Sequence, residues 1–254
     1  MEFAQIFNEA NMVGFLLLFF RFAGLFTAIP IFDHKNIPMH IKAVIAFFFT
    51  VFFYASVPVP KISLDILDIV VAILGELLLG LSVGIVLQLA YNVITFAGGQ
   101  ISYMMGFSLA SAIDPQTGVS MPIVSQFLSL LALMTLFALN LHHWILLFVA
   151  HTLQTVPLGG FMVSKHFFGY IMHATSNMFL VGFMIAFPII ALSLLADVIF
   201  GMLMKTMPQF NLLVIGFPIK IMVSFVVLIA TLTAIMLVLK GQVQEAFNML
   251  ETFF

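Results

Sequence analysis

The side chains that could do chemistry in this 254-residue chain gather in one short polar stretch, Gly106–Pro122, with the sequence GFSLASAIDPQTGVSMP. Serine hydroxyls and a carboxylate beside them are groups that hydrolases use for nucleophilic catalysis. Residues 106–110 match half of a nucleophile elbow, but the final glycine is missing and no strand is predicted before it. The phosphate-binding pattern GxxxxGK followed by Ser or Thr is also absent. We therefore expect no catalysis.

Histidines are the next candidates, as metal ligands. His142 and His143 are adjacent and point to different faces of a helix, unlike the i, i+4 pair of a zinc helix. His151, His166 and His173 have no carboxylate at ligand spacing. The chain has no cysteine, which excludes disulfides and thiol chemistry. We predict neither a metal nor a cofactor.

Charged side chains inside apolar runs are the third group of interest. These are Arg21, Glu76, Asp197 and Lys220. Each would cost at least ~2.5–3.5 kcal/mol at the centre of a lipid-facing helix, so we expect them to face protein or water. Structural ion pairs and a role along a pathway are both open. Lys205 lies two turns, about 12 Å, from Asp197, so the two need other partners.

The rest of the chain must position these groups in a membrane. It is 63% hydrophobic and only 7% charged, against about 25% charged in soluble domains. With a net charge of −2 and no basic block, we expect no nucleic-acid partner. The first basic residue is Arg21, so we expect no cleavable signal peptide. The apolar segments are Met12–Ile29, Ile41–Val57, Ile66–Ala97, Ile123–Val156, Ser176–Leu203 and Leu212–Leu239.

These segments predict an all-α, polytopic membrane protein of about six long, partly broken helices packed as hairpins. Ile66–Ala97 and Ile123–Val156 exceed the ~20 residues that cross a bilayer. We expect them to tilt, break, or project into a protein assembly. The C-terminal residues Val243, Phe247, Leu250 and Phe254 form an apolar stripe at helical spacing. They predict an amphipathic helix that lies on the membrane or against a partner.

Small and polar residues recur every fourth position in two segments. One stripe comprises Glu76, Gly80, Gly84, Gln88 and Asn92, and the other comprises Ser193, Asp197, Gly201 and Lys205. Such stripes let membrane helices approach closely. Packing within the chain and packing against other subunits are both open. We expect Arg21 and these stripes to support helix packing and assembly.

A second interruption is predicted in MPQFNLLVIGFPIK, Met207–Lys220, because Pro208 and Pro218 lack amide donors and Gly216 loosens the segment. Non-helical backbone at membrane depth is tolerated only where protein or a water-filled cavity surrounds it. The two interruptions indicate a passage, which fits a transporter or a protein-conducting channel.

Five segments together resemble the FliR/SctT family of type III secretion export-gate proteins. They are RFAGLFTAIPIF (21–32), GELLLGLSVG (75–84), MGFSLASAIDPQTGVSMPI (105–123), HTLQTVPLG (151–159) and MPQFNLLVIGFPIK (207–220). The resemblance covers essentially the whole chain. It implies helices packed as hairpins in a helical multi-subunit assembly. It also implies a FliP-like part over about 1–155, and a FliQ-like helical hairpin with an amphipathic C-terminal tail over about 156–254. It also implies FliP, FliQ and FlhB as partners, at the flagellar basal body in the bacterial inner membrane.

The same resemblance implies that 106–122 is a pore-closing plug. Glycines and prolines supply a movable, non-helical backbone, and apolar side chains can close a pore by excluding water. The implied plug residues are Gly106, Phe107, Leu109, Ile113, Asp114, Pro115, Gly118, Val119, Met121 and Pro122. Near Ala112 the family pattern has a bulky aromatic, and this chain has a small residue.

The expected function is a non-catalytic subunit of the flagellar type III export gate, which passes unfolded flagellar proteins. The alternative is a secondary transporter that binds a small solute at a broken helix. That class usually shows two matching halves with similar interruptions, whereas the two interruptions here differ in length and composition.

Overall fold

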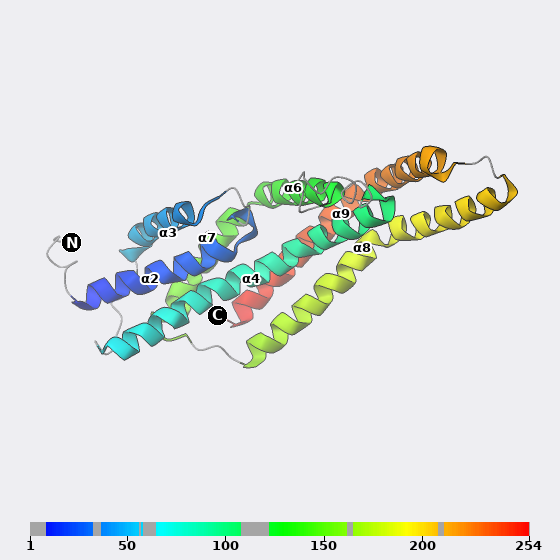
Figure 1. The fold of residues 1–254 in the computed structure, drawn as a ribbon. Helices are drawn as coiled ribbons and strands as arrows, with labels where there is room; N and C mark the ends of the chain where they lie inside the picture. The colour runs from blue at the N-terminus through cyan, green and yellow to red at the C-terminus, as the bar shows by residue number, and fades with distance from the viewer. Residues whose placement is uncertain are drawn as a thin grey trace. The chain divides into compact units, whose positions relative to one another are not determined.

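A computed structural model describes residues 9–32, 37–55, 57, 65–107, 122–161, 165–207 and 211–253, and this part of the chain is all-α (Figure 1). Its α-helices are α2 (Glu9–Ala28), α3 (Met39–Tyr54), α4 (Ile66–Met105), α6 (Ile123–Ala138), α7 (Leu141–Thr155), α8 (Lys165–Thr206) and α9 (Phe217–Phe253). A 3₁₀ turn, η1, covers Pro30–Phe32, and a π-helical turn, η3, covers Leu212–Gly216. The prediction of an all-α fold is confirmed.

Four helical stretches are long and apolar enough to cross a membrane: Glu9–Ala28, Ile66–Met105, Phe167–Thr206 and Val214–Phe253. The number rises to five if α6 and α7 form one broken span. The helix α3 has 16 residues and is shorter than a typical span. These helices confirm the prediction of a polytopic membrane-type protein.

The longest helices exceed the thickness of a bilayer. The helix α4 has 40 residues and α8 has 42, about 60 Å each at 1.5 Å per residue. The hydrocarbon core is only ~30 Å thick. The predicted third segment, which was expected to end at Ala97, continues as helix to Met105. Pro188 lies inside α8 and does not end it.

The predicted fourth segment, Ile123–Val156, breaks, which is one of the alternatives expected for this overlong run. The chain forms α6 and α7, which are bent by 61° at Leu139–Asn140. Asn140 has φ 57° and ψ 33°, the left-handed conformation. Asparagine adopts that conformation more readily than most residues. A left-handed residue cannot continue a right-handed helix, so α6 ends there.

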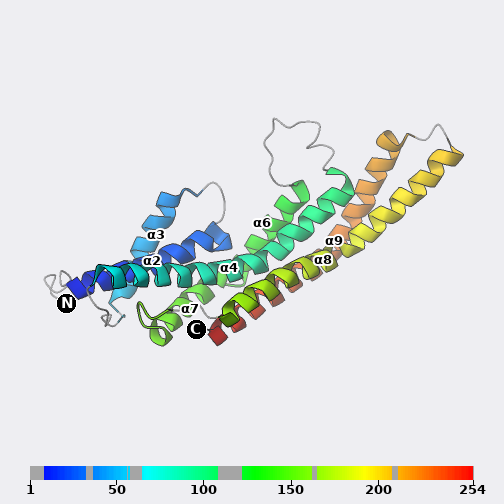
Figure 2. The same ribbon diagram turned by 60° about the horizontal axis from the view of Figure 1, so that its bottom comes forward.

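The chain divides into two compact units. Unit 1 comprises residues 1–89, 140–174 and 244–254, and unit 2 comprises residues 90–139 and 175–243. In unit 1, α2 and α3 lie side by side (Figures 1 and 2). The ring centroid of Phe22 lies 5.8 Å from that of Phe49 and 5.5 Å from that of Phe53. Contacts between tilted aromatic rings therefore join these two helices.

In unit 2, α8 and α9 pack as an antiparallel hairpin (Figure 2). Near one end, Asn177 Nδ2 donates to Gln242 Oε1 at 3.2 Å. Further along, Lys220 on α9 meets Asp197 on α8. Residue numbers rise along one helix as they fall along the other, which defines the antiparallel direction and agrees with the predicted hairpin packing.

The C-terminal stripe has the predicted amphipathic helical pattern, with Val243, Phe247 and Leu250 buried, but its apolar face packs against α7 of the same chain and not against a partner or the membrane. Its described residues belong to α9, while Phe254 lies outside the described residues. Phe247 is buried, and its ring centroid lies 5.5 Å from that of Trp144 and 6.4 Å from that of Phe148 on α7. The apolar stripe is therefore buried against α7 of the same chain.

The second predicted interruption is shorter than expected. Gly216 lies in the π-helical turn η3, and Pro218 and Lys220 lie in the first turn of α9. Proline is tolerated in a first turn because its missing N–H would have no partner within the helix there. Met207 and Asn211 are not helical, and Pro208 lies outside the described residues.

Candidate functional site

The ends of the predicted plug lie in unit 2. Of the ten implied plug residues, the structure describes Gly106, Phe107 and Pro122. The remaining seven lie outside the described residues: Leu109, Ile113, Asp114, Pro115, Gly118, Val119 and Met121. The structure therefore describes the two segments that flank the loop. We call them together the loop stem: residues 91–107, which are the last part of α4 and the two residues after it, and residues 122–129, which are Pro122 and the first part of α6.

Hydroxyl groups join the two sides of the loop stem. Ser125 Oγ donates to the Thr95 carbonyl oxygen at 2.7 Å, and the hydroxyls of Thr95 and Ser129 are 3.1 Å apart. Tyr91 donates its hydroxyl to the Ser129 carbonyl oxygen at 3.0 Å. In an apolar surrounding such bonds have little competition from water. They fix the register of α4 against α6.

One glycine lets the two helices of the stem touch. A Cβ atom at Gly98 would lie 2.6 Å from Ser125 Cα, which is backbone and cannot rotate away. At the neighbouring Gly99, a Cβ atom would meet no heavy atom within 4 Å. Close backbone approach of this kind requires a residue without a side chain. Gly98 is therefore fixed by packing, whereas Gly99 is free of that constraint.

The start of α6 is capped by α4. The first N–H groups of a helix have no partner within the helix. Pro122, directly before α6, makes no side-chain cap. Instead, Ser102 Oγ accepts a hydrogen bond from the Val124 N–H at 3.1 Å. Ser102 of α4 thus caps the N-terminus of α6, a role that the N-cap residue of the helix itself usually has.

The other end of the loop stem rests on α9. Gly106 has φ +90°, a conformation that favours glycine and that commonly ends helices. A Cβ atom there would lie 3.0 Å from a ring carbon of Phe217. The ring of Phe107 packs edge-on against Phe225, with centroids 6.2 Å apart. Both ends of the loop are therefore anchored.

The sequence analysis did not single out Thr95, Ser102 or Ser125. Extending the first stripe by four residues from Asn92 reaches Phe96, so that stripe does not include Thr95 or Ser102, and Ser125 lies on α6. Gly98, Ser102 and Gly106 recur at every fourth position, and this spacing is the signal in the sequence that could have indicated the loop stem.

A buried ion pair joins two helices of unit 1. Arg21 on α2 donates from Nε to Glu76 Oε2 and from Nη2 to Glu76 Oε1, the latter at 3.0 Å. Arg21 is 1% exposed and Glu76 is 0% exposed. A two-pronged guanidinium–carboxylate pair is the strongest geometry for such a contact. These two charges therefore face each other rather than lipid.

The pair also binds the end of α7. Arg21 donates to the carbonyl oxygens of Thr152 and Val156, both at 3.2 Å. Carbonyls at a helix C-terminus lack partners within the helix and carry partial negative charge, so a guanidinium is favourable there. Glu76 Oε1 accepts the Gly159 N–H at 2.7 Å. Two side chains thus connect α2, α4, α7 and the turn after α7.

The first stripe packs against α2 of the same chain. A Cβ atom at Gly80 would lie 2.1 Å from the Arg21 carbonyl oxygen. One at Gly84 would lie 2.4 Å from the Ala28 Cβ atom, and one at Gly24 would lie 2.5 Å from the Leu77 carbonyl oxygen. Packing within the chain, one of the two alternatives, accounts for these glycines. Gln88 is half-buried further along α4.

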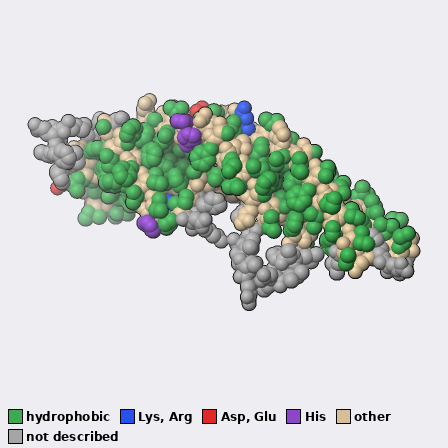
Figure 3. Space-filling model, turned by 90° about the horizontal axis from the view of Figure 1, so that it is seen from above, with side chains coloured by type: hydrophobic (Ala, Val, Ile, Leu, Met, Phe, Trp, Pro, Cys, Tyr) green, Lys and Arg blue, Asp and Glu red, His purple; other side chains and the backbone are tan. Residues whose placement is uncertain are grey.

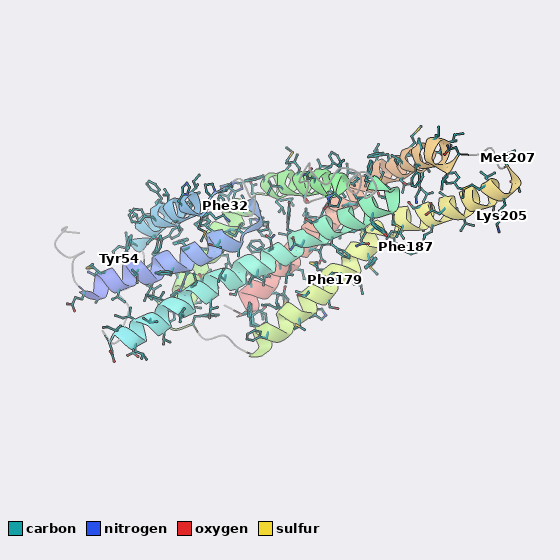
Figure 4. The ribbon with its side chains drawn as sticks, viewed as in Figure 1. Phe32, Tyr54, Phe179, Phe187, Lys205 and Met207 are labelled. Atoms are coloured by element: carbon teal, nitrogen blue, oxygen red, sulfur yellow. The ribbon has the colours of Figure 1, made fainter. Side chains whose placement is uncertain are left out.

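The second stripe, on α8 in unit 2, is different. Lys220 Nζ donates to Asp197 Oδ1 and Oδ2 at 2.8 Å and 2.9 Å, which identifies the partner that Asp197 was predicted to need. A Cβ atom at Gly201 would meet no heavy atom within 4 Å. Lys205 is exposed near the end of α8 (Figure 4). Within the described residues, this stripe is close-packed only near its start.

Breaking the Asp197–Lys220 pair should destabilise unit 2 modestly. Asp197 is 52% exposed, so solvent screens the pair, and we expect Asp197→Asn to cost roughly 1 kcal/mol. Asp197→Lys should cost more, because it places two ammonium groups together. Thermal unfolding of the purified chain in detergent measures both. The charge-swapped variant, Asp197→Lys with Lys220→Asp, should recover most of the loss, and an equal loss in the swap would disprove the pairing.

The face of the described part that Figure 3 shows is mainly hydrophobic. A shallow groove of about 580 Å³ lies along α8, lined by Ser176, Phe179, Leu180, Phe183, Met184 and Phe187. Phe179 and Phe187 mark its length in Figure 4. No charged side chain lines it. No group of three His, Cys, Asp or Glu residues within the described ranges could hold a metal ion.

Long apolar helices, a buried ion pair and close glycine contacts define an integral membrane protein whose helices pack tightly. The chain belongs to the family described as bacterial export proteins, family 1, whose model matches residues 12–246.

Three relatives place the chain within this family. It is 33% identical to the flagellar biosynthetic protein FliR of Bacillus subtilis, over 90% of this chain and 89% of the relative. It is 30% identical to FliR of Escherichia coli, over 91% of this chain and 88% of the relative. It is 24% identical to FliR of Aquifex aeolicus, over 98% of this chain and 96% of the relative.

Proposed function

We propose that this chain is a non-catalytic subunit of the flagellar type III export gate, which helps to form and plug the channel for unfolded flagellar proteins. The observation that carries this proposal is the family match over residues 12–246 together with relatives named as flagellar biosynthetic proteins. The loop stem supports it further, because it holds both ends of the segment 106–122.

The proposal includes the place and the partners of the chain. We infer that it lies in the bacterial inner membrane at the flagellar basal body and assembles with FliP, FliQ and FlhB. We assign about 1–155 as the FliP-like part and about 156–254 as the FliQ-like part, a division that the α8–α9 hairpin supports. The lengths of α4 and α8 support a fold that extends beyond the bilayer.

Polar and charged stripe residues have two roles in this proposal. Arg21, Glu76, Gly80 and Gly84 shape unit 1, so that it can be incorporated into the gate. Gly201, whose surroundings in the described chain are open, provides a close-approach position for a helix of another subunit. Gln88, Asp197 and Lys205 belong to the same two stripes, and we assign them to assembly because of that position.

Deleting the loop should open the gate. We expect a chain that lacks residues 108–121, with a short glycine–serine linker in their place, to raise the leak of small molecules across the inner membrane. The reason is that apolar side chains close a pore by excluding water. Uptake of a small polar dye by cells that produce the complete gate measures the leak.

The control for this experiment is the same deletion in cells that lack FliP, where no channel forms. An unchanged permeability, with the complex recovered in normal amount, would show that the loop is not a plug. The alternative of a secondary transporter predicts instead that the purified chain alone carries a solute into liposomes. The apolar lining of the groove on α8 does not favour that alternative.

A further inference from the structure

The α8–α9 hairpin of unit 2 contains two buried hydroxyl groups that the loop stem and the ion pairs do not use. Ser193 on α8 and Ser224 on α9 are each 0% exposed. Neither hydroxyl has a hydrogen-bond partner within the described chain. Buried polar groups in proteins nearly always have a partner, from the protein or from an ordered water molecule. The two serines therefore require an explanation.

Several other hydroxyls inside helices of this chain donate to a backbone carbonyl of their own helix. Ser82 donates to the Leu79 carbonyl oxygen at 2.7 Å, and Thr50 donates to that of Ala46 at 2.7 Å. Thr231, on α9 itself, donates to the Val227 carbonyl oxygen at 2.9 Å. This bond to the preceding turn is the usual choice of Ser and Thr inside a helix. Ser193 and Ser224 do not make it.

Helix geometry brings the two serines to the same level of the hairpin. The contact between Asp197 and Lys220 fixes the register of the antiparallel helices. Ser193 lies four residues before Asp197, and Ser224 lies four residues after Lys220. Residues four apart share one face of a helix. Both serines therefore lie on the facing surfaces of α8 and α9, one turn from the ion pair.

The neighbouring ammonium group has hydrogen-bonding capacity to spare. Lys220 is 7% exposed, and two of its three N–H donors go to the oxygens of Asp197. Each serine thus lies four residues, about one helical turn, from the member of this ion pair on its own helix. A cation there would be repelled by the ammonium of Lys220, and an anion would be repelled by the carboxylate of Asp197. The ligand that fits is small, neutral, and both a donor and an acceptor.

We propose that Ser193 and Ser224 bind a water molecule between α8 and α9, one turn from the Asp197–Lys220 pair. Buried waters typically make about three hydrogen bonds to groups that would otherwise lack partners. The two hydroxyls and the ammonium supply that number. Serine is small, so two serines that face each other leave room between the helices. The water gives the apolar interior of the hairpin a polar link next to its ion pair. This inference is independent of the export function.

A double-mutant cycle on the full-length chain, purified in detergent, tests the site. If water bridges the serines, Ser193→Ala and Ser224→Ala each remove one of its partners and should lower the unfolding midpoint by about 2–4 °C. The double variant removes both polar groups and should lose clearly less than the sum. Ser82→Ala, whose hydroxyl bonds its own helix, is the control for a buried serine outside the site.

A dry site predicts the opposite sign. Each serine would then be an unsatisfied hydroxyl, so both single variants would raise the midpoint and their effects would add. That result would overturn the proposal. A midpoint that rises in sodium chloride but not in choline chloride, and only when both serines are present, would assign the site to a cation and would overturn it too.

Infrared spectroscopy gives a second measurement that does not depend on unfolding. The chain has no cysteine, so Ser224→Cys introduces a single S–H stretching band. A thiol that donates to bound water should show this band at lower wavenumber than an unbonded thiol. We expect the shift to persist when Ser193→Ala is added, because water keeps Lys220 as a partner. Loss of the shift in that background would indicate a direct bond to Ser193, and an unshifted band in both would indicate a dry site.

Discussion

Replacing Glu76 with alanine should abolish most recovery of the folded chain and of any complex that contains it. The substitution leaves the guanidinium of Arg21 buried at 1% exposure with no countercharge. It also leaves the Gly159 N–H without its acceptor. Breaking a buried ion pair by removing one partner costs about 3–5 kcal/mol, a large part of the stability of an ordinary domain. The yield of complex after detergent extraction, relative to wild type, measures the loss.

Two control variants test whether the loss of yield comes from the unpaired buried charge of Arg21. Glu251→Ala removes an exposed carboxylate of α9 and should leave the yield unchanged. Arg21→Met combined with Glu76→Leu removes both buried charges and should recover part of the yield, because an apolar pair replaces an ion pair at little cost. The recovery stays partial, since the carbonyls of Thr152 and Val156 lose their donor. Normal yield of Glu76→Ala with a selective loss of export would assign Glu76 to conduction instead of assembly.

Residue types alone predicted the charged contacts because a charge inside an apolar run is costly and must find a partner. The sequence could not say that Arg21 meets Glu76 and that Asp197 meets Lys220. Those pairings depend on which helices become neighbours. Arg21 and Glu76 are separated by a whole helix, and no local spacing rule reaches that far. The all-α class followed from long, continuous apolar runs, because a helix pairs all backbone N–H and C=O groups within one such segment.

Helix breaks were harder to predict than helices. Prolines do not mark the helix breaks. Pro188 lies inside α8, and Pro218, where an interruption was predicted, lies in the first turn of α9. The break between α6 and α7 falls at Asn140, inside a run without proline or glycine. Asparagine tolerates the left-handed conformation without demanding it, so tertiary packing decides. The C-terminal stripe likewise predicted an apolar helix face, but the sequence could not predict that this face packs against α7.

Adding a single methyl group at Gly98 should loosen the loop stem, whereas the same change at Gly99 should not. The Cβ atom of Gly98→Ala would lie 2.6 Å from Ser125 Cα, so α6 must move away from α4. Overpacking of this kind costs about 1–3 kcal/mol. Gly99→Ala meets open space and should stabilise α4 by about 0.5–1 kcal/mol, because alanine orders a helix more readily than glycine. Thermal unfolding of the two purified variants should therefore show shifts of opposite sign.

The permeability of the assembled gate should also differ between Gly98→Ala and Gly99→Ala. When α6 moves, the Val124 N–H loses the Ser102 hydroxyl that caps it, and the segment 106–122 loses a fixed attachment. We therefore expect Gly98→Ala to raise the leak of a small polar dye in cells with the complete gate, while Gly99→Ala leaves the leak at the wild-type level. If Gly98→Ala and Gly99→Ala leak equally, contact between α4 and α6 does not hold the loop in place.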